Sequence, residues 1–264
     1  MHQSPDALAT ARAALDAART TPRRAATVSA ALDALERLIT AQEQARQPRL
    51  VPLVSPLTPP AMRLALVPRQ EHAKRAIEVA LVGLHRVTLI ARGDPADAAA
   101  LAAWLTAYAP DTATVVRPCP CGNHDDPRLP CGCTPEAIIA HLARPDVAQA
   151  LLAEIVVTMP PPATMSLALG EPDEHILARV AAARTRRVPD ERVDADQPFV
   201  AQLTDPGARS LLRAALRDIP MSGVRLRQML AVAASIAKLA AAPTITASHL
   251  AEALQYRPRL PGEA

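Results

Sequence analysis

The sequence predicts a mainly helical α/β protein that contains a small parallel sheet. Val87–Ile90 and Thr112–Val116 are short apolar segments with the length and composition of buried strands, and Ala96–Tyr108 between them has a helical pattern. Alternation of strand, helix and strand is typical of a parallel sheet. Beyond residue 163 the apolar residues recur at helical spacing, so we expect the C-terminal part to be entirely helical.

Composition indicates a soluble protein with an aliphatic core. Half of the 264 residues are apolar and only 2% are aromatic, so Ala, Leu, Val and Ile must fill the interior. A charged fraction of 21% and the lack of a long apolar run argue against a membrane span. Residues 1–20 carry no signal-peptide pattern, which predicts a cytoplasmic protein. The net charge of +3 permits binding to nucleic acid without requiring it.

Changes in pattern divide the chain into four segments. Residues 1–47 are predicted to form a helical hairpin, because apolar residues recur at helical spacing on both sides of a Thr-Pro break. Residues 48–61 hold five prolines and are predicted to be an extended linker. Residues 62–162 are expected to form the α/β core, and residues 163–264 a domain of helices.

Each element has its own local signal. In the core we expect helices at Gln70–Val82, Ala96–Tyr108 and Pro135–Ala143, and a further strand inside Leu151–Met159 that stops at three prolines. In the C-terminal domain we expect helices at 173–187, 206–217, 222–241 and 246–255. Ser222 is the predicted N-cap of the third, and Thr246 or Ser248 of the last.

Two Cys-x-Cys pairs make up the whole cysteine content. They are Cys119, Cys121, Cys131 and Cys133. In a cytosolic chain such clustering indicates a metal site before a disulfide, and four thiolates suit tetrahedral zinc. Because the usual zinc spacing is Cys-x₂-Cys, reduced packing thiols and a redox disulfide stay open as alternatives. His124 is either a replacement ligand or an exposed loop histidine.

Four stretches carry a resemblance to a known family. They are QEHAKRAIEVA (70–80), the CPCG…CGCTPEAI segment (119–138), LLAEIVV (151–157) and residues 221–257, which end in HLAEALQYR. In this order they resemble the magnesium-chelatase-like AAA+ ATPases, in particular the branch that contains the DNA-uptake helicase ComM. The resemblance covers roughly residues 62–257. It implies an AAA+ core with a helical lid, ATP as ligand, a hexameric ring and movement on DNA.

The phosphate-binding loop of that family is degenerate here. A P-loop needs a Gly-rich backbone, a Lys for the β/γ-phosphates and a Ser or Thr for magnesium. At the corresponding place Asp97 replaces the Lys and Ala98 replaces the Ser or Thr, and no Gly-Lys pair occurs in the chain. ATP is therefore not an expected cofactor. The degenerate positions are Ala91, Arg92, Gly93, Asp94, Ala96, Asp97 and Ala98.

Other catalytic positions of the family are altered as well. The resemblance places a sensor Asn where the chain has Arg117, and an arginine finger where it has Ala153-Glu154. The lid arginine aligns with Val224, beside Arg225, and no strand ends in the expected Asp-Glu pair. We therefore assign no catalytic residue and do not expect an enzyme.

Two groups of arginines are candidates for contacts with an anion or DNA. They are Arg184, Arg186 and Arg187, and Arg225 and Arg227. Solvated helix surfaces are the alternative for both groups. His85, at the start of the first strand, is predicted to cap an element and not to act as a catalyst.

Four functions are compatible with these features. We favour a non-catalytic AAA+-derived module that binds a paralogous AAA+ ATPase or DNA. The alternatives are an ATP-binding helicase of the ComM type with an unconventional site, a zinc-stabilised DNA-binding protein, and a gene product without activity. Zinc is the candidate cofactor, no membrane partner is expected, and self-association stays open.

Overall fold

The fold is described from a computed structural model that covers residues 63–124, 126, 128–160, 170–188, 203–219 and 221–257. The contact pattern divides the chain into Met1–Arg49 and Leu50–Ala264, and every described residue belongs to the second unit. The predicted hairpin (1–47) and the predicted linker (48–61) lie outside the described residues. Within the described part, no helix combines the length and the apolar character needed to cross a bilayer.

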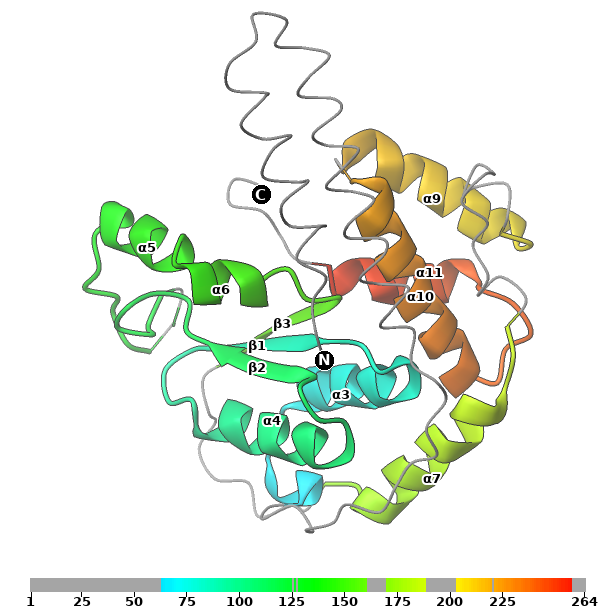
Figure 1. The fold of residues 1–264 in the computed structure, drawn as a ribbon, viewed down its shortest axis with the longest axis horizontal. Coiled ribbons are helices and arrows are strands. Elements are labelled where there is room, and N and C mark those ends of the chain that lie inside the picture. Colours follow the sequence, from blue (N-terminus) through cyan, green and yellow to red (C-terminus); the bar gives the residue numbers. More distant parts are fainter. Residues whose placement is uncertain are drawn as a thin grey trace, which may run out of the picture. The chain divides into compact units, whose positions relative to one another are not determined.

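Three parallel strands form the sheet, in the order β2-β1-β3 (Figure 1). They are β1 (Val87–Ala91), β2 (Ala113–Val116) and β3 (Ile155–Met159). Val87 of the central strand lies opposite Ala113 on one side and Ile155 on the other. The predicted small parallel sheet is confirmed. Because the strands are parallel, the loops that follow β1 and β2 leave the sheet at the same edge.

Helices cover both faces of the sheet to different extents. They are the 3₁₀ helix η1 (Leu64–Leu66), α3 (Glu71–Gly83), α4 (Ala96–Tyr108), α5 (Pro135–Leu142) and α6 (Pro145–Ala150). α3 and α4 pack on the face to which Val87 and Leu89 contribute (Figure 1). On the other face, Thr88 donates a hydrogen bond from Oγ1 to the carbonyl oxygen of Ala150 in α6, at 2.6 Å. The prediction did not include α6, whose six residues are too few to show a helical period.

The C-terminal part is helical, as predicted. It contains α7 (Asp173–Thr185), α9 (Pro206–Asp218), α10 (Gly223–Leu239) and α11 (Ala247–Gln255). Ser222 caps α10 by accepting the backbone N–H of Arg225 at 3.3 Å. Thr246, and not Ser248, is the N-cap of α11, and His249 completes a capping box by accepting the Thr246 N–H on Nδ1.

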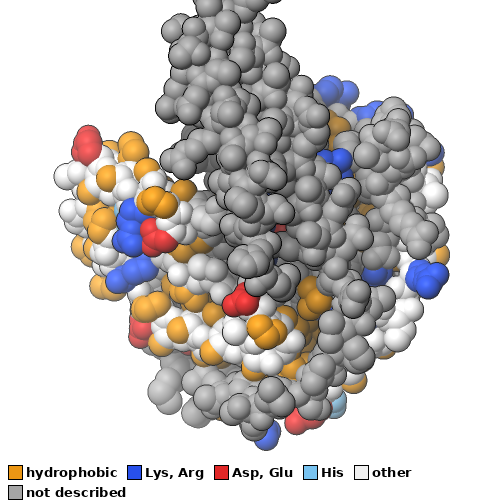
Figure 2. Space-filling view, in the orientation of Figure 1, with side chains coloured by type: hydrophobic (Ala, Val, Ile, Leu, Met, Phe, Trp, Pro, Cys, Tyr) orange, Lys and Arg blue, Asp and Glu red, His pale blue; other side chains and the backbone are white. Residues whose placement is uncertain are grey.

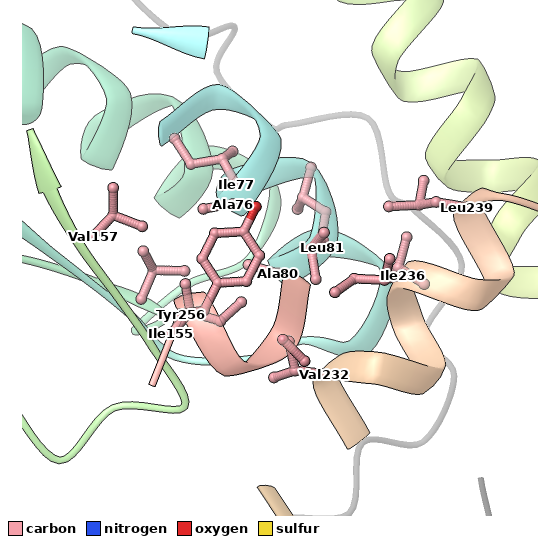
Figure 3. Packing of buried hydrophobic residues seen from close by; sticks show 14 of the residues in the cluster. Ala76, Ile77, Ala80, Leu81, Ile155, Val157, Val232, Ile236, Leu239 and Tyr256 are labelled. Atoms are coloured by element: carbon pink, nitrogen blue, oxygen red, sulfur yellow. The ribbon is translucent and has the colours of Figure 1, made fainter. Parts of the chain in front are cut away.

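α3 lies at the centre of the hydrophobic core. Ile77 and Leu81 are fully buried, between the sheet and the C-terminal helices. Figure 3 shows α3 side chains facing Ile155 of β3 and Ile236 of α10, with the ring of Tyr256 among them. A single cluster of buried apolar residues thus includes elements from both sides of the predicted domain border at 162/163.

Candidate functional site

The four cysteines lie together in the loop between β2 and α5. The Sγ atom of Cys119 is 3.4 Å from that of Cys121 and 3.8 Å from that of Cys131. Including Cys133, all four sulfur atoms lie within 4.8 Å of one another, and none is in a disulfide. Tetrahedral zinc with Zn–S bonds of ~2.3 Å places its sulfur ligands roughly 3.8 Å apart. The cluster therefore fits a metal ion such as zinc.

Hydrogen bonds act differently on the four thiols. The Gly122 N–H points at the sulfur of buried Cys119, with N and Sγ 3.2 Å apart. The backbone N–H of Asn123, together with the neighbouring thiols, lowers the pKa of Cys121 to about 6, which favours the thiolate that a metal requires. Although backbone N–H groups act to lower them, the pKa values of Cys131 and Cys133 are raised, because burial and the hydrogen bonds with Cys121 and Cys119 favour the neutral thiols. His124 is not among the side chains that share this cluster.

The loop that carries the cysteines, residues 117–134, is called the cysteine loop below. It binds the short loop between β1 and α4, Arg92–Pro95, which is called the β1–α4 loop. The Gly93 N–H donates to the carbonyl oxygen of Gly122 at 3.0 Å. Arg117 spans both loops, since its Nη2 donates to the carbonyl oxygen of Cys121 at 2.9 Å and to that of Gly93 at 3.3 Å. The two loops are thereby one hydrogen-bonded unit.

Glycine is required at one point of this unit. Gly122 has φ +84°, a conformation that residues with a Cβ rarely adopt. A Cβ built there would lie 2.2 Å from Nη2 of Arg117. By contrast, a Cβ on Gly132, in the same loop, would meet no atom within 4 Å. Arg117 can therefore reach across the loop only because residue 122 has no side chain.

Acidic groups surround the helix start that follows the β1–α4 loop. Asp94 accepts the backbone N–H of Ala96 on Oδ1 at 2.9 Å, and Asp97 stands in the first turn of α4. Pro95, the N-cap of α4, has no N–H to donate. The remaining degenerate positions are Ala91, which is buried at the end of β1, Arg92, which is half-buried, and Ala98, which is buried on α4.

Arg117 also connects the cysteine loop to α5. Its carbonyl oxygen lies 3.0 Å from Nε2 of His141. The family resemblance placed Arg117 only at the position of a sensor residue. The sequence did not predict that its side chain connects two loops. The contacts of Arg117 depend on two backbone carbonyls, those of Gly93 and Cys121, and on His141, and none of these partners has a signal in the local sequence.

The comparison with known families identifies the C-terminal region. Residues 170–257 match the family described as magnesium chelatase, subunit ChlI C-terminal. The match covers about a third of the chain, and over these residues the chain is similar to that family. The matched residues contain α7, α9, α10 and α11. The match confirms the resemblance of residues 221–257 to the magnesium-chelatase-like family. A comparison of the whole chain with curated proteins found no match.

A buried carboxylate joins the C-terminal helices, which begin with α7, to the core. Asp173, in the first turn of α7, is 8% exposed. Its Oδ1 accepts the backbone N–H of Leu64 at 2.9 Å, and its Oδ2 accepts the indole N–H of Trp104 at 2.8 Å. Asp173 thus connects η1, α4 and α7. Sequence reasoning missed this residue, because an acid in the first turn of a helix is ordinary.

Ion pairs reinforce the same joint on α3. Glu78 is 5% exposed and accepts hydrogen bonds from Arg75 of its own helix and from Arg179 of α7. Arg75 also donates to Glu252 of α11 at 2.9 Å. His85, predicted to cap an element, is buried, and its Nε2 lies 2.8 Å from Oγ of Ser235 on α10.

The predicted arginine-finger position carries an ion pair of its own. Glu154 accepts the backbone N–H of Arg86 at 2.9 Å and pairs with its guanidinium at 3.1 Å. Burial by itself would raise the pKa of Glu154, but the charge and hydrogen bonds of Arg86 outweigh burial, so the pKa lies below its usual value. Glu154 therefore holds the start of β3 against β1.

The structure does not bring the two groups of candidate arginines together. Arg186 donates to the carbonyl oxygen of Lys238 at 2.8 Å, so its group lies beside the C-terminal end of α10. Arg225 lies in the first turn of α10 and donates to the carbonyl oxygens of Leu152 and Ala153. Its group therefore lies at the N-terminal end of α10. The 17 residues of α10 separate the groups by about 25 Å. Arg187 is exposed, Arg227 is half-buried, and burial lowers the pKa of Arg184.

Proposed function

We propose that this chain is a non-catalytic, AAA+-derived module that acts by binding another macromolecule, either a paralogous AAA+ ATPase or DNA. One observation carries the proposal: the Gly93 N–H is used by Gly122 of the cysteine loop. In a P-loop, the backbone N–H groups between the strand and the helix bind phosphate oxygens. A phosphate would have to displace the cysteine loop before it could use this donor.

Electrostatics supports the same proposal. Asp97 occupies the position of the P-loop Lys, and Asp94 already accepts an N–H at the start of α4. A carboxylate about 4 Å from a phosphate charge raises the free energy of the complex by about 4 kcal/mol at an effective dielectric constant near 20. Since ~1.4 kcal/mol is a factor of ten in affinity, one such repulsion weakens binding about a thousandfold.

The cysteine cluster fits a structural role in this module. Four protein thiolates complete the tetrahedral shell of zinc and leave no position open for a substrate. When bound, zinc would cross-link the two Cys-x-Cys pairs and so hold the loop that covers Gly93. A cytoplasmic location, which is part of the proposal, would keep the thiols reduced when no metal is bound.

Calorimetric titration of the purified protein with ATP and Mg²⁺ tests the proposal. We expect no saturable heat, and no rise of the melting temperature in a parallel thermal-shift series. A ligand at about 100 times its Kd would stabilise the protein by about 2.7 kcal/mol, which such a series detects readily. Saturable binding that Arg92→Gln abolishes would contradict the proposal. Arg63→Gln removes the same charge from an exposed position outside the site and serves as the matched control.

A further inference from the structure

We propose that the outer face of α9 binds the phosphate backbone of a nucleic-acid duplex. This inference rests on the proposed function, since it names the chemistry of one partner of the module. Arg209, Arg213 and Arg217 follow one another at intervals of four residues on α9 and are called the α9 ridge below. Four residues of helix rise about 6 Å, so the three side chains leave the same face about one turn apart.

The α9 ridge points away from the core. The opposite face of the helix carries Ala208, Leu212 and Ala215, which are buried, and this face packs on α11. Arg213 and Arg217 are exposed, and Arg209 is half-buried. Figure 2 shows Lys and Arg side chains at the upper right, in the area where Figure 1 places α9.

Helix stability does not explain the α9 ridge. Like charges four residues apart repel, and each such pair destabilises a helix by about 0.2–0.5 kcal/mol. The helix dipole favours a cation only in the last turn, which accounts for Arg217 and not for Arg209 or Arg213. Asp205 is occupied as the N-cap, where it accepts the Ala208 N–H at 2.6 Å.

The ridge differs from the arginines that form ion pairs. Arg75, Arg86, Arg144 and Arg179 each pair with a carboxylate, whereas Arg117, Arg186 and Arg225 donate to backbone carbonyl oxygens. Among the described residues, no carboxylate lies within ion-pair distance of Arg213 or Arg217. The guanidinium of Arg209 donates to the carbonyl oxygen of Leu203 at 3.3 Å, which fixes the chain just before α9. Within the described part of the chain, two exposed positive charges in register thus have no acidic partner.

A duplex backbone has the matching chemistry. Each strand carries one negative charge per ~3.4 Å along the axis, so cations about 6 Å apart meet phosphates at nearly every second step. Guanidinium groups bind phosphate with two parallel hydrogen bonds. Stacking on single-stranded bases needs exposed aromatic rings; among the described residues Trp104 and Tyr256 are buried and Tyr108 is half-buried. The ridge therefore suits a duplex bound without reading its sequence.

Fluorescence anisotropy with a labelled duplex of about 20 base pairs tests the inference between about 50 and 200 mM salt. For the full chain we expect a plot of log affinity against log salt with a slope near −2, since each phosphate contact contributes about −0.9. The double variant Arg213→Gln/Arg217→Gln should weaken binding at least about tenfold at low salt and bring the slope near zero. Arg213→Gln alone should remove one phosphate contact, so the slope should become less negative by about one.

The double variant Arg63→Gln/Arg144→Gln is the matched control, because it removes the same charge from exposed positions outside α9. It should bind the duplex like the unmodified protein. No duplex binding at low salt, equal losses in both double variants, or tighter binding of single strands or of an oligo-glutamate peptide would each overturn the inference. The two proposals are tested by different measurements. Absence of duplex binding would contradict the role of the α9 ridge, whereas saturable ATP binding in the calorimetric titration would contradict the proposed function.

Discussion

The cysteine loop and the joint between α3 and the C-terminal helices are stabilised in different ways. In the cysteine loop, Cys119 is buried, no residue of neighbouring α5 is buried, and backbone hydrogen bonds make the contacts to the β1–α4 loop. At the joint, a continuous apolar core surrounds α3, and buried Asp173 and Glu78 have their partners in place. The comparison teaches that the described residues of the cysteine loop and α5 depend on hydrogen bonds and have no apolar core of their own, whereas the helices that match a known family share the core around α3.

The largest effect should follow metal removal, and it should be confined to the cysteine loop. If zinc is bound, metal analysis gives one ion per chain, and Cys119→Ser or a strong chelator removes it. We expect amide hydrogen exchange in residues 117–134 to lose its protection, because a structural zinc site supplies the stability of the segment that it cross-links. Exchange in β1 and α10 should stay slow. Equal loss of protection in α10 would remove the distinction between the two regions.

The next effect should appear at the joint. Asp173→Ala leaves the Trp104 indole N–H and the Leu64 N–H without their acceptor in a buried place. Each unsatisfied buried donor costs about 1–3 kcal/mol, so for the two donors we expect the free energy of unfolding to fall by about 2–6 kcal/mol. Urea denaturation measures it. Glu174→Ala, the exposed neighbour in the same helical turn, should change stability by less than about 0.5 kcal/mol.

A smaller effect should separate two glycines of the cysteine loop. Gly122→Ala forces a Cβ into Arg117 at a positive φ angle, and we expect a loss of about 1–3 kcal/mol together with the Arg117 bridge. Gly132→Ala meets nothing and should be close to neutral. Thermal denaturation of both variants is the measurement. Similar melting temperatures for the two would mean that the Arg117 bridge contributes little to the fold.

The smallest effect concerns pH and the Arg86–Glu154 pair. The pKa of Glu154 in the folded protein is below its usual value. Ionised Glu154 therefore stabilises the folded state fully when the pH is above the ordinary pKa of Glu, and this contribution is lost as the pH falls through the lowered pKa. Arg86 is one-third exposed, so the pair is worth less than about 1 kcal/mol. Glu154→Gln should remove this part of the acid dependence, as urea titrations at several pH values would reveal. An unchanged acid dependence would assign it to other carboxylates.

Local sequence patterns predicted most of the secondary structure. The strands and the long helices have periods that repeat over several residues, so their own side chains identify them. α6 was missed because six residues are too few for a period. The cysteine cluster was found because its four ligands stand close in sequence and their chemistry is specific.

The sequence by itself determined most of the element types, the clustered thiols and the absence of a Gly-Lys pair from the chain. Only the tertiary structure decided that Gly93 is bound to Gly122, that Asp173 joins Leu64 and Trp104, and that the candidate arginines lie at opposite ends of α10. Helix and strand preferences arise from neighbours along the chain, whereas the partner of a buried polar group depends on how distant segments cross. Asp173 and Leu64, for example, are 109 residues apart in the sequence and meet only in the folded chain.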